Sequence, residues 1–261
     1  MVENVENSLL DQNLPRFGET PVLMYHRVVP EAPKGTLNNI HVTCSELSAQ
    51  LSSLTRRGFE FVTFTDLIEG VRPNKPVIIT FDDGYRDNHD FLLPLLQQHQ
   101  ARAVICALGD RGLKSNTWDI PTGEPEAQLM NDDELKGCYD TGRIEIASHG
   151  LRHRHLTDLS DTELTDEVVS SKERLEHLLG HEVVSFAYPY GQYGSREVSA
   201  VRSAGYQFAV GTENGPLYMA EDRWRIRRIA IFSGSSGFSF WKKSSGFYHR
   251  YCRIKGKKEY R

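Results

Sequence analysis

Two short motifs hold most of the side chains that could perform chemistry. The stretch Thr-Phe-Asp-Asp-Gly-Tyr contains the adjacent carboxylates Asp82 and Asp83, and Ser-His-Gly-Leu-Arg-His contains His149 and His153. If residues 150–153 form one helical turn, both imidazoles lie on the same face. Two imidazoles and one carboxylate leave a coordination position for water, as in a catalytic zinc site. The pattern predicts a divalent metal held by Asp83, His149 and His153, with Asp82 available as a base.

Both motifs follow apolar runs that predict buried strands. Pro76–Ile79 precedes the two carboxylates, and Ile144–Ala147 precedes the first histidine. A third fragment, Ser185–Gly191, again carries a predicted strand into a turn with proline and glycine. Proteins of the α/β class build their reactive sites beyond the carboxyl ends of their strands. We therefore expect the candidate ligands to lie on that face.

Simpler interpretations exist for each motif alone. Asp-Asp-Gly is a favourable turn sequence, because Asp and Gly support local hydrogen bonds and positive φ. A His-x-x-x-His pair can be a surface or capping pair. The combination of the fragments is more specific than either part.

The three fragments, in this order, resemble the polysaccharide deacetylases of the NodB-homology type, also called carbohydrate esterase family 4. The resemblance covers Pro21 to Phe232. It implies a distorted (β/α)7 barrel forming a single domain. It also implies that Asp82 is the catalytic base and that Asp83 is a metal ligand together with the two histidines.

The chain departs from the commonest form of this family in the third motif. That form has Arg-x-Pro-Tyr, whereas Ala187 stands at the arginine position here. An ion pair that orients the base therefore cannot be assumed. His155 falls outside the ligand spacing, and a supporting or surface role is expected for it.

The usual late motif with an acid histidine is also missing. However, Val22–Arg27 is similar to the amino-terminal segment of the subgroup that deacetylates poly-N-acetylglucosamine, and this implies His26 as the general acid. The alternative is a histidine that is hydrogen-bonded at the end of a first strand.

The expected chemistry is amide hydrolysis. A bound Zn²⁺ lowers the pKa of its water toward ~7 and polarises the carbonyl oxygen. Asp82 would accept a proton, a backbone N–H near Tyr190 would help to hold the oxyanion, and His26 would protonate the departing amine. Zn²⁺ is preferred, although Co²⁺ or Ni²⁺ would also suit this ligand set.

Four further residues are expected to bind substrate. The loop 111–126 is long and lacks periodicity, and such loops are more often functional than idle. Its Trp118 could stack on a sugar ring or could simply hold the loop in place. The full predicted substrate-binding set is Tyr85, Trp118, Tyr188 and Pro189.

Composition is that of an ordinary globular enzyme. The 261 residues are 39% hydrophobic and 25% charged, with a net charge of −4, so one domain can bury a full core. Four cysteines without close pairing suggest neither a disulfide framework nor a zinc knuckle. We expect an N-terminal polar extension (1–19), a deacetylase domain (20–232), and a Gly/Ser hinge with a basic tail (233–261).

Location is inferred from what the sequence lacks. The start is acidic and polar, unlike a signal peptide, and no stretch approaches the ~20 apolar residues of a membrane span. This predicts a cytoplasmic enzyme that meets a lipid-linked or nucleotide-linked sugar or a short oligosaccharide. The basic and aromatic residues of 241–261 could contact an anionic membrane at its inner face, whereas a solvated tail is the alternative. No nucleic-acid recognition motif is present.

Strands and helices are predicted to alternate, which favours a parallel sheet. The predicted helices are Ser45–Arg57 with Ser45 as N-cap, a short one from Thr65, and then Asp90–Gln100, Asn131–Tyr139, Ser160–Leu179 and Ser195–Ala204. Further strands are predicted at Phe59–Phe64, Ala103–Leu108, Phe208–Gly211 and Trp224–Ile231.

The predicted function is metal-dependent removal of the N-acetyl group from an amino sugar in a glycan or glycan precursor. One alternative is hydrolysis of another non-peptide amide, such as deformylation of a modified sugar. Another is a carbohydrate-binding protein that keeps the metal site without turnover, suggested by Ala187. The sequence does not name the sugar or choose between polymer and precursor, and it leaves the metal, the oligomeric state and the role of the tail open.

Overall fold

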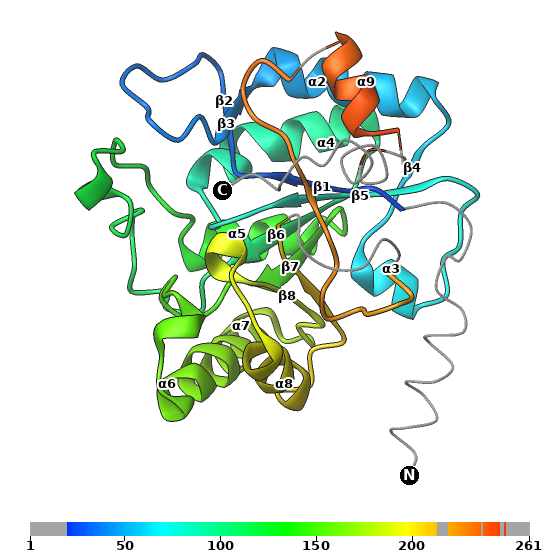
Figure 1. The fold of residues 1–261 in the computed structure, drawn as a ribbon. Coiled ribbons are helices and arrows are strands. Elements are labelled where there is room, and N and C mark those ends of the chain that lie inside the picture. Colours follow the sequence, from blue (N-terminus) through cyan, green and yellow to red (C-terminus); the bar gives the residue numbers. More distant parts are fainter. Residues whose placement is uncertain (1–19, 213–218, 236, 246–247, 249–261) are drawn as a thin grey trace.

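The computed structural model describes residues 20–212, 219–235, 237–245 and 248 (Figure 1). A curled parallel sheet forms its centre, with strand order β10-β1-β5-β6-β7-β8-β9 and β4 beside β5. The strands are β1 (Val22–Tyr25), β4 (Glu60–Phe61), β5 (Pro76–Phe81), β6 (Ala103–Ala107), β7 (Ile144–Ser148), β8 (Ser185–Ala187), β9 (Phe208–Val210) and β10 (Ile229–Ala230). A separate two-stranded sheet joins β2 (Arg27–Val29) to β3 (His41–Thr43).

The segment that leads into β10 brings the two edges of the sheet together. Ile226 bridges Val210 in parallel, next to the end of β9. A few residues later, Ile229 and Ala230 pair with β1 at the opposite edge. The sheet therefore curls into a distorted barrel, and the predicted (β/α)7 fold and single domain are confirmed.

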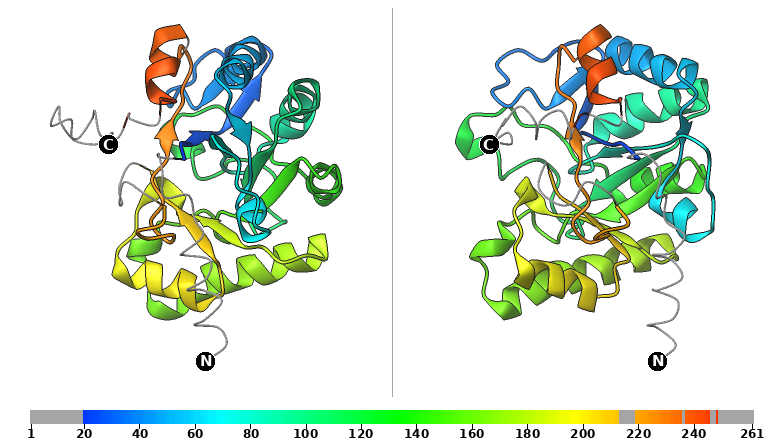
Figure 2. Two further views of the ribbon diagram at one scale, coloured as in Figure 1. Left: turned by 90° about the vertical axis from the view of Figure 1, so that its right-hand side faces the viewer. Right: turned by 45° about the vertical axis from the view of Figure 1, so that its right-hand side comes forward.

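Helices cover the outside of the curled sheet (Figure 2). They are α2 (Cys44–Arg56), α3 (Phe64–Ile68), α4 (Leu93–His99), α5 (Asp132–Asp140), α6 (Asp161–Thr165), α7 (Ser171–Leu179), α8 (Ser195–Ser203) and α9 (Gly237–Lys243). A π-helical turn, Asp166–Ser170, joins α6 to α7, so that this helical stretch runs unbroken from Asp161 to Leu179. Its length agrees with the predicted helix over Ser160–Leu179.

Buried apolar side chains fill both faces of the strands, which explains why the strands read as continuous hydrophobic runs. Leu47, Leu51 and Leu54 of α2 lie in the outer cluster between helices and sheet, as their spacing predicted. Ile78 and Val104 belong to a second cluster with residues of α3, β8 and β9.

Several predicted boundaries were wrong. Thr43, rather than Ser45, caps α2, because the Thr43 hydroxyl accepts from the Glu46 N–H while the Glu46 carboxylate accepts from the Thr43 N–H. The strand predicted over Phe59–Phe64 shrinks to Glu60–Phe61, since Thr63 caps α3 in the same way. The last strand shrinks from Trp224–Ile231 to Ile229–Ala230.

The region after residue 232 is only partly described. Helix α9 places Phe240 in the core, and Lys243 donates to the carbonyl of Ala230. The side chains of Phe238 and Trp241 are stacked and exposed. The predicted extension 1–19 and most of the basic tail lie outside the described residues, so the predicted domain division stays a prediction. Within the described part, no helix has the length and apolar character that crossing a membrane requires.

Candidate active site at the carboxyl ends of the strands

The three predicted metal ligands lie together in the structure. Asp83 follows β5, and His149 and His153 follow β7, so all three extend from the carboxyl ends of the parallel strands. Their ligand atoms lie within 4.8 Å of one another, and all three side chains are buried. Asp83 Oδ1 is 3.3 Å from His149 Nε2 and 3.2 Å from His153 Nε2.

This spacing fits a tetrahedral divalent ion. Ligands about 2.0–2.1 Å from Zn²⁺ stand about 3.3–3.4 Å from one another in a tetrahedron. In addition, Asp83 Oδ1 is buried without a hydrogen-bond partner among the described residues. Buried polar atoms are normally satisfied, so this oxygen is consistent with a bound ligand.

The loop between the two histidines is not the helical turn that the spacing suggested. Gly150 has φ +76° and His153 has φ +57°, which interrupts right-handed helix. Asp83 also has positive φ, at +73°. Such backbone costs non-glycine residues on the order of 1–3 kcal/mol and clusters at functional sites. The imidazoles therefore converge through a strained loop, while the prediction that they converge is confirmed.

The end of β8 orients one of the ligands. His149 Nδ1 lies 2.8 Å from the carbonyl oxygen of Ala187. Donation from Nδ1–H leaves the Nε2 lone pair facing Asp83 and the metal position, as is usual for metal-binding histidines. Burial would lower the pKa of His149, but the carboxylates of Asp82 and Asp83 outweigh it and raise that pKa. For His153, burial prevails and lowers the pKa, which favours a neutral ring.

The predicted base is held by an arginine that the sequence analysis missed. Arg228 Nη1 and Nη2 donate to Asp82 Oδ1 and Oδ2 at 2.6 and 2.7 Å. The same guanidinium donates to the Gly211 carbonyl and the Thr80 hydroxyl, and both Arg228 and Asp82 are buried. Two parallel charge-assisted bonds fix the carboxylate in one orientation.

Arg228 also sets the charge of the base. Burial alone would raise the pKa of Asp82, but Arg228, with His149 and His26, lowers it to about 2. Asp82 is therefore ionised at neutral pH. For Asp83, burial would raise the pKa, but the neighbouring His149 and His153 outweigh it, so the pKa of Asp83 lies well below its usual range.

The sequence left open whether an ion pair holds the predicted base, because Ala187 replaces the arginine of the third motif. The structure contains such a pair, and its arginine comes from the segment before β10. In the sequence, Arg227 and Arg228 stand beside an apolar run. A charged side chain is rarely buried there unless it is paired, so this position indicates a buried partner. Sequence alone does not reveal its partner, because the contact depends on barrel closure.

The candidate acid lies next to the base in the fold. His26 follows β1 directly, and the Asp82 N–H donates to the carbonyl of Tyr25, so the two residues stand at the same level of neighbouring strands. His26 helps to lower the pKa values of both aspartates, and its buried Nδ1 has no hydrogen-bond partner among the described residues. Its role as acid stays a prediction.

Aromatic side chains surround the candidate ligands. The Trp118 ring stacks on His153 with centroids 4.4 Å apart, and Tyr190 meets the same imidazole edge-on at 4.5 Å. His155 stacks on Tyr190 at 3.7 Å. One face of the Trp118 ring thus packs on the candidate metal ligand His153 and holds the loop 111–126 against it. Tyr190 is 39% exposed, and burial together with Asp119 and Asp83 raises its pKa to about 12, so its phenol is neutral.

The remaining predicted substrate residues are buried. Tyr85 is fully buried in an apolar cluster with Leu108 and Leu129, and its hydroxyl has no hydrogen-bond partner among the described residues. Pro189 packs beside Gly150, 3.5 Å from where a Cβ would stand. The Tyr188 ring is also in the core, and its hydroxyl donates to the Trp224 carbonyl. The structure therefore brings neither tyrosine side chain to the open face.

Comparison with known proteins agrees with this geometry. The family model for polysaccharide deacetylases matches residues 69–209, just over half of the chain. The Bacillus subtilis protein YxkH is 27% identical over 84% of this chain and 74% of its own length. The poly-beta-1,6-N-acetyl-D-glucosamine N-deacetylase of Staphylococcus epidermidis is 24% identical over 80% of this chain and 78% of that protein.

A solved structure shares the fold. The deacetylase PplD of Streptococcus pyogenes, determined in complex with acetate, gives a TM-score of 0.73 at 21% identity and covers 87% of this chain and 98% of its own. From the family match, supported by the barrel and the site at its strand ends, the chain belongs to the polysaccharide deacetylase family, in its NodB-homology form, and is a hydrolase.

Proposed function

We propose that this hydrolase removes the N-acetyl group from an amino sugar within a glycan, using one divalent metal. The observation that carries the proposal is the pairing of a complete ligand set with an ionised, oriented base beside it. A protein that only bound carbohydrate would have little use for a buried carboxylate held by two charge-assisted bonds. Arg228 supplies the ion pair that Ala187 cannot make, and this supports turnover over binding alone.

The metal fits the residues present. Asp83, His149 and His153 would hold it through Oδ1, Nε2 and Nε2. When bound there, Zn²⁺ would lower the pKa of a coordinated water toward ~7 and polarise the substrate carbonyl. Zn²⁺ is proposed over Co²⁺ and Ni²⁺ because tetrahedral sites of histidine and carboxylate commonly hold zinc.

Two side chains, Asp82 and His26, carry out different proton transfers. Asp82 accepts a proton from the attacking water, since it is ionised at neutral pH and Arg228 fixes its orientation. His26 protonates the amine that leaves, because an imidazole can be a proton donor near neutral pH. A backbone N–H near Tyr190 is proposed to share the oxyanion charge.

The substrate proposed first is an oligomer of N-acetylglucosamine. Support comes from the Staphylococcus epidermidis relative, whose name states that it acts on poly-beta-1,6-N-acetyl-D-glucosamine. Trp118 and the exposed Tyr190 stand beside the metal position, where an aromatic surface suits a sugar ring. Action in the cytoplasm, on a lipid-linked precursor at an anionic membrane, is a further proposal that cell fractionation would test.

Acetate release tests the proposal. Metal-free protein would be restored with one equivalent of Zn²⁺ and given N-acetylglucosamine oligomers and lipid- or nucleotide-linked N-acetyl sugars, with Asp82→Asn as the control. Release that requires Zn²⁺ and disappears in the control supports the function. Stoichiometric metal without release from any of these compounds contradicts it.

A further inference from the structure

The loop that carries both histidine ligands needs support from outside itself. Residues 150–153 form no regular helix, and His153 holds a left-handed conformation that is unfavourable for an L-residue. Two N–H groups in the middle of the loop, those of Leu151 and Arg152, have no helical or sheet partner. If they were left unpaired, the histidines would not be held in one geometry.

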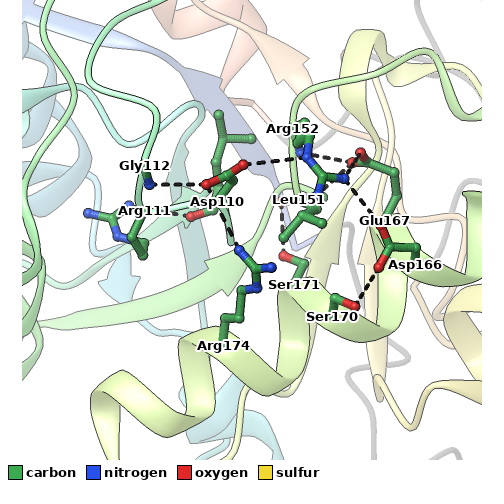
Figure 3. Close-up of polar contacts among 12 residues, drawn as sticks. Asp110, Arg111, Gly112, Leu151, Arg152, Asp166, Glu167, Ser170, Ser171 and Arg174 are labelled. Atoms are coloured by element: carbon green, nitrogen blue, oxygen red, sulfur yellow. Dashed lines mark hydrogen bonds and ion pairs between the residues drawn. The ribbon is translucent and has the colours of Figure 1, made fainter.

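A buried carboxylate supplies the missing partners. Glu167 Oε2 accepts from the N–H groups of Leu151 and Arg152, both at 2.9 Å (Figure 3). Glu167 has an exposed fraction of 0%. The loop lies so close to it that a Cβ on Gly150 would stand 3.3 Å from Oε2. Glu167 thus replaces, for this loop, the carbonyl groups that a helix would have provided.

Glu167 sits in an unusual element. It belongs to the π-helical turn Asp166–Ser170 that joins α6 to α7. Such turns are rare and occur frequently at functional sites, because the extra residue redirects the side chains around it. The π-helical turn thus carries the carboxylate that accepts from the histidine loop.

Further contacts hold the loop from other sides. The Ser171 hydroxyl and the Gly109 N–H donate to the Gly150 carbonyl, and the Asp110 N–H donates to that of Leu151. Figure 3 shows the Arg152 guanidinium between Asp110 on one side and Asp166 and Glu167 on the other. Its nitrogens lie 3.4, 3.2 and 3.6 Å from these three carboxylates.

We propose that Glu167 is a positioning residue for the metal site. It touches neither the ligand atoms nor the open face, and it acts through the backbone of residues 151 and 152 to keep both imidazoles aimed at Asp83. The inference rests on the proposed function, since it requires that the site bind a metal. Groups that orient metal ligands typically contribute 10- to 100-fold to metal affinity.

The test is a Zn²⁺ affinity measurement by chelator competition, together with the visible absorption spectrum of the Co²⁺ form. Glu167→Ala leaves two buried N–H groups unpaired and should weaken Zn²⁺ binding by about 10- to 100-fold. Glu167→Gln keeps an oxygen that can accept from both N–H groups, but it loses the negative charge that strengthens these bonds and faces Arg152, so its Zn²⁺ affinity should fall between that of Glu167→Ala and the wild type. Both variants should alter the Co²⁺ spectrum, because the ligand geometry changes.

Glu145 provides a matched control. It is also a buried carboxylate that accepts from a backbone N–H, that of Thr65, and from a hydroxyl, that of Ser185. However, it lies near the amino end of β7, away from the metal ligands. Glu145→Gln should lower the melting temperature and leave Zn²⁺ affinity and the Co²⁺ spectrum unchanged.

The outcomes separate the two hypotheses. Wild-type protein that binds no metal overturns the proposed function and the inference with it. If the wild type binds Zn²⁺ and both Glu167 variants bind it with the same affinity, the positioning role of Glu167 is overturned and the proposed function is not. If Glu167→Ala does not fold, Glu167→Gln decides, since an unchanged affinity and Co²⁺ spectrum in that variant contradict the positioning role.

Discussion

The two ends of strand β7 use buried polar groups in opposite ways. At its amino end, Glu145 has both carboxylate oxygens engaged, by the Thr65 N–H and the Ser185 hydroxyl. At its carboxyl end, Asp83 Oδ1 lies beside the Nε2 atoms of His149 and His153 and has no hydrogen-bond partner among the described residues. Buried polar groups stabilise a fold when satisfied and are costly when not. We infer that the polar groups at the amino end of β7 stabilise the fold, whereas those at its carboxyl end are arranged to bind a ligand.

Backbone strain follows the same division. Asp83, His153 and Tyr190 combine positive φ with positions at the candidate site. Each such conformation costs about 1–3 kcal/mol, which surrounding contacts must offset. At the site those contacts come from Glu167, Arg228 and the stacked ring of Trp118. We therefore expect substitutions at the two ends to separate activity from stability.

The largest effect is expected for His149→Ala. The variant removes one of three protein ligands, so it should lose stoichiometric Zn²⁺ and all measurable acetate release. Metal analysis by mass spectrometry after dialysis would check the first outcome and an acetate assay the second. A variant that retained one equivalent of Zn²⁺ would show that the ligand set is misassigned.

Asp82→Asn comes next. The amide keeps the shape of the base but cannot accept the proton, and general bases contribute about 10²–10⁴-fold. We expect kcat to fall by that factor while one Zn²⁺ stays bound. This variant distinguishes the role of Asp82 as base from that of Asp83 as metal ligand. An unchanged rate would eliminate Asp82 as the base.

Arg228→Met tests the origin of the base's low pKa. Without Arg228, burial would raise the pKa of Asp82 above its present value of about 2. The acid-side fall of kcat/KM should then move to higher pH, and kcat/KM at neutral pH should drop about 10- to 100-fold through lost orientation. A pH profile that superimposes on the wild type would contradict this role.

The same variant has a predictable effect on stability. In the wild type, the depressed pKa of Asp82 stabilises the fold above the unfolded-state pKa of about 3.9, and this contribution is lost as pH falls toward about 2. Leaving the buried charge unpaired should cost about 3–5 kcal/mol at pH 7 and less near pH 4. Urea unfolding of both proteins at the two pH values measures this difference.

Glu145→Gln should have the smallest effect on catalysis. Its carboxamide loses one of the two acceptor oxygens, so the free energy of unfolding should fall by about 1–3 kcal/mol. Acetate release should stay within about twofold of the wild type, since Glu145 lies at the far end of β7. If Glu145→Gln lost most of its activity but none of its stability, the proposed difference between the two ends of β7 would be contradicted.

The sequence predicted the three clustered candidate metal ligands because they occupy short motifs directly after buried strands. Parallel strands bring their carboxyl ends to one face, so Asp83 and His149 could be placed without coordinates. It could not predict how His153 reaches them, because the helical turn assumed for residues 150–153 is replaced by a loop with positive φ at Gly150 and His153.

Contacts that depend on barrel closure were also beyond sequence reasoning. Arg228 precedes β10 and meets Asp82 across 146 positions of sequence, a pairing that no local pattern encodes. Glu167 lies within the helix predicted over Ser160–Leu179, and no sequence pattern indicates that its carboxylate accepts from the histidine loop. Tyr188 was misjudged for the opposite reason, since a motif residue turned into the core.

The central claim is that one metal ion at Asp83, His149 and His153 drives deacetylation. The most direct test is to add Zn²⁺ stepwise to metal-free protein and measure the rate of acetate release from an N-acetylglucosamine oligomer. We expect a linear rise that stops at one equivalent of Zn²⁺ per chain. Full activity in metal-free protein, or a rate that does not respond to Zn²⁺, Co²⁺ or Ni²⁺, would contradict it.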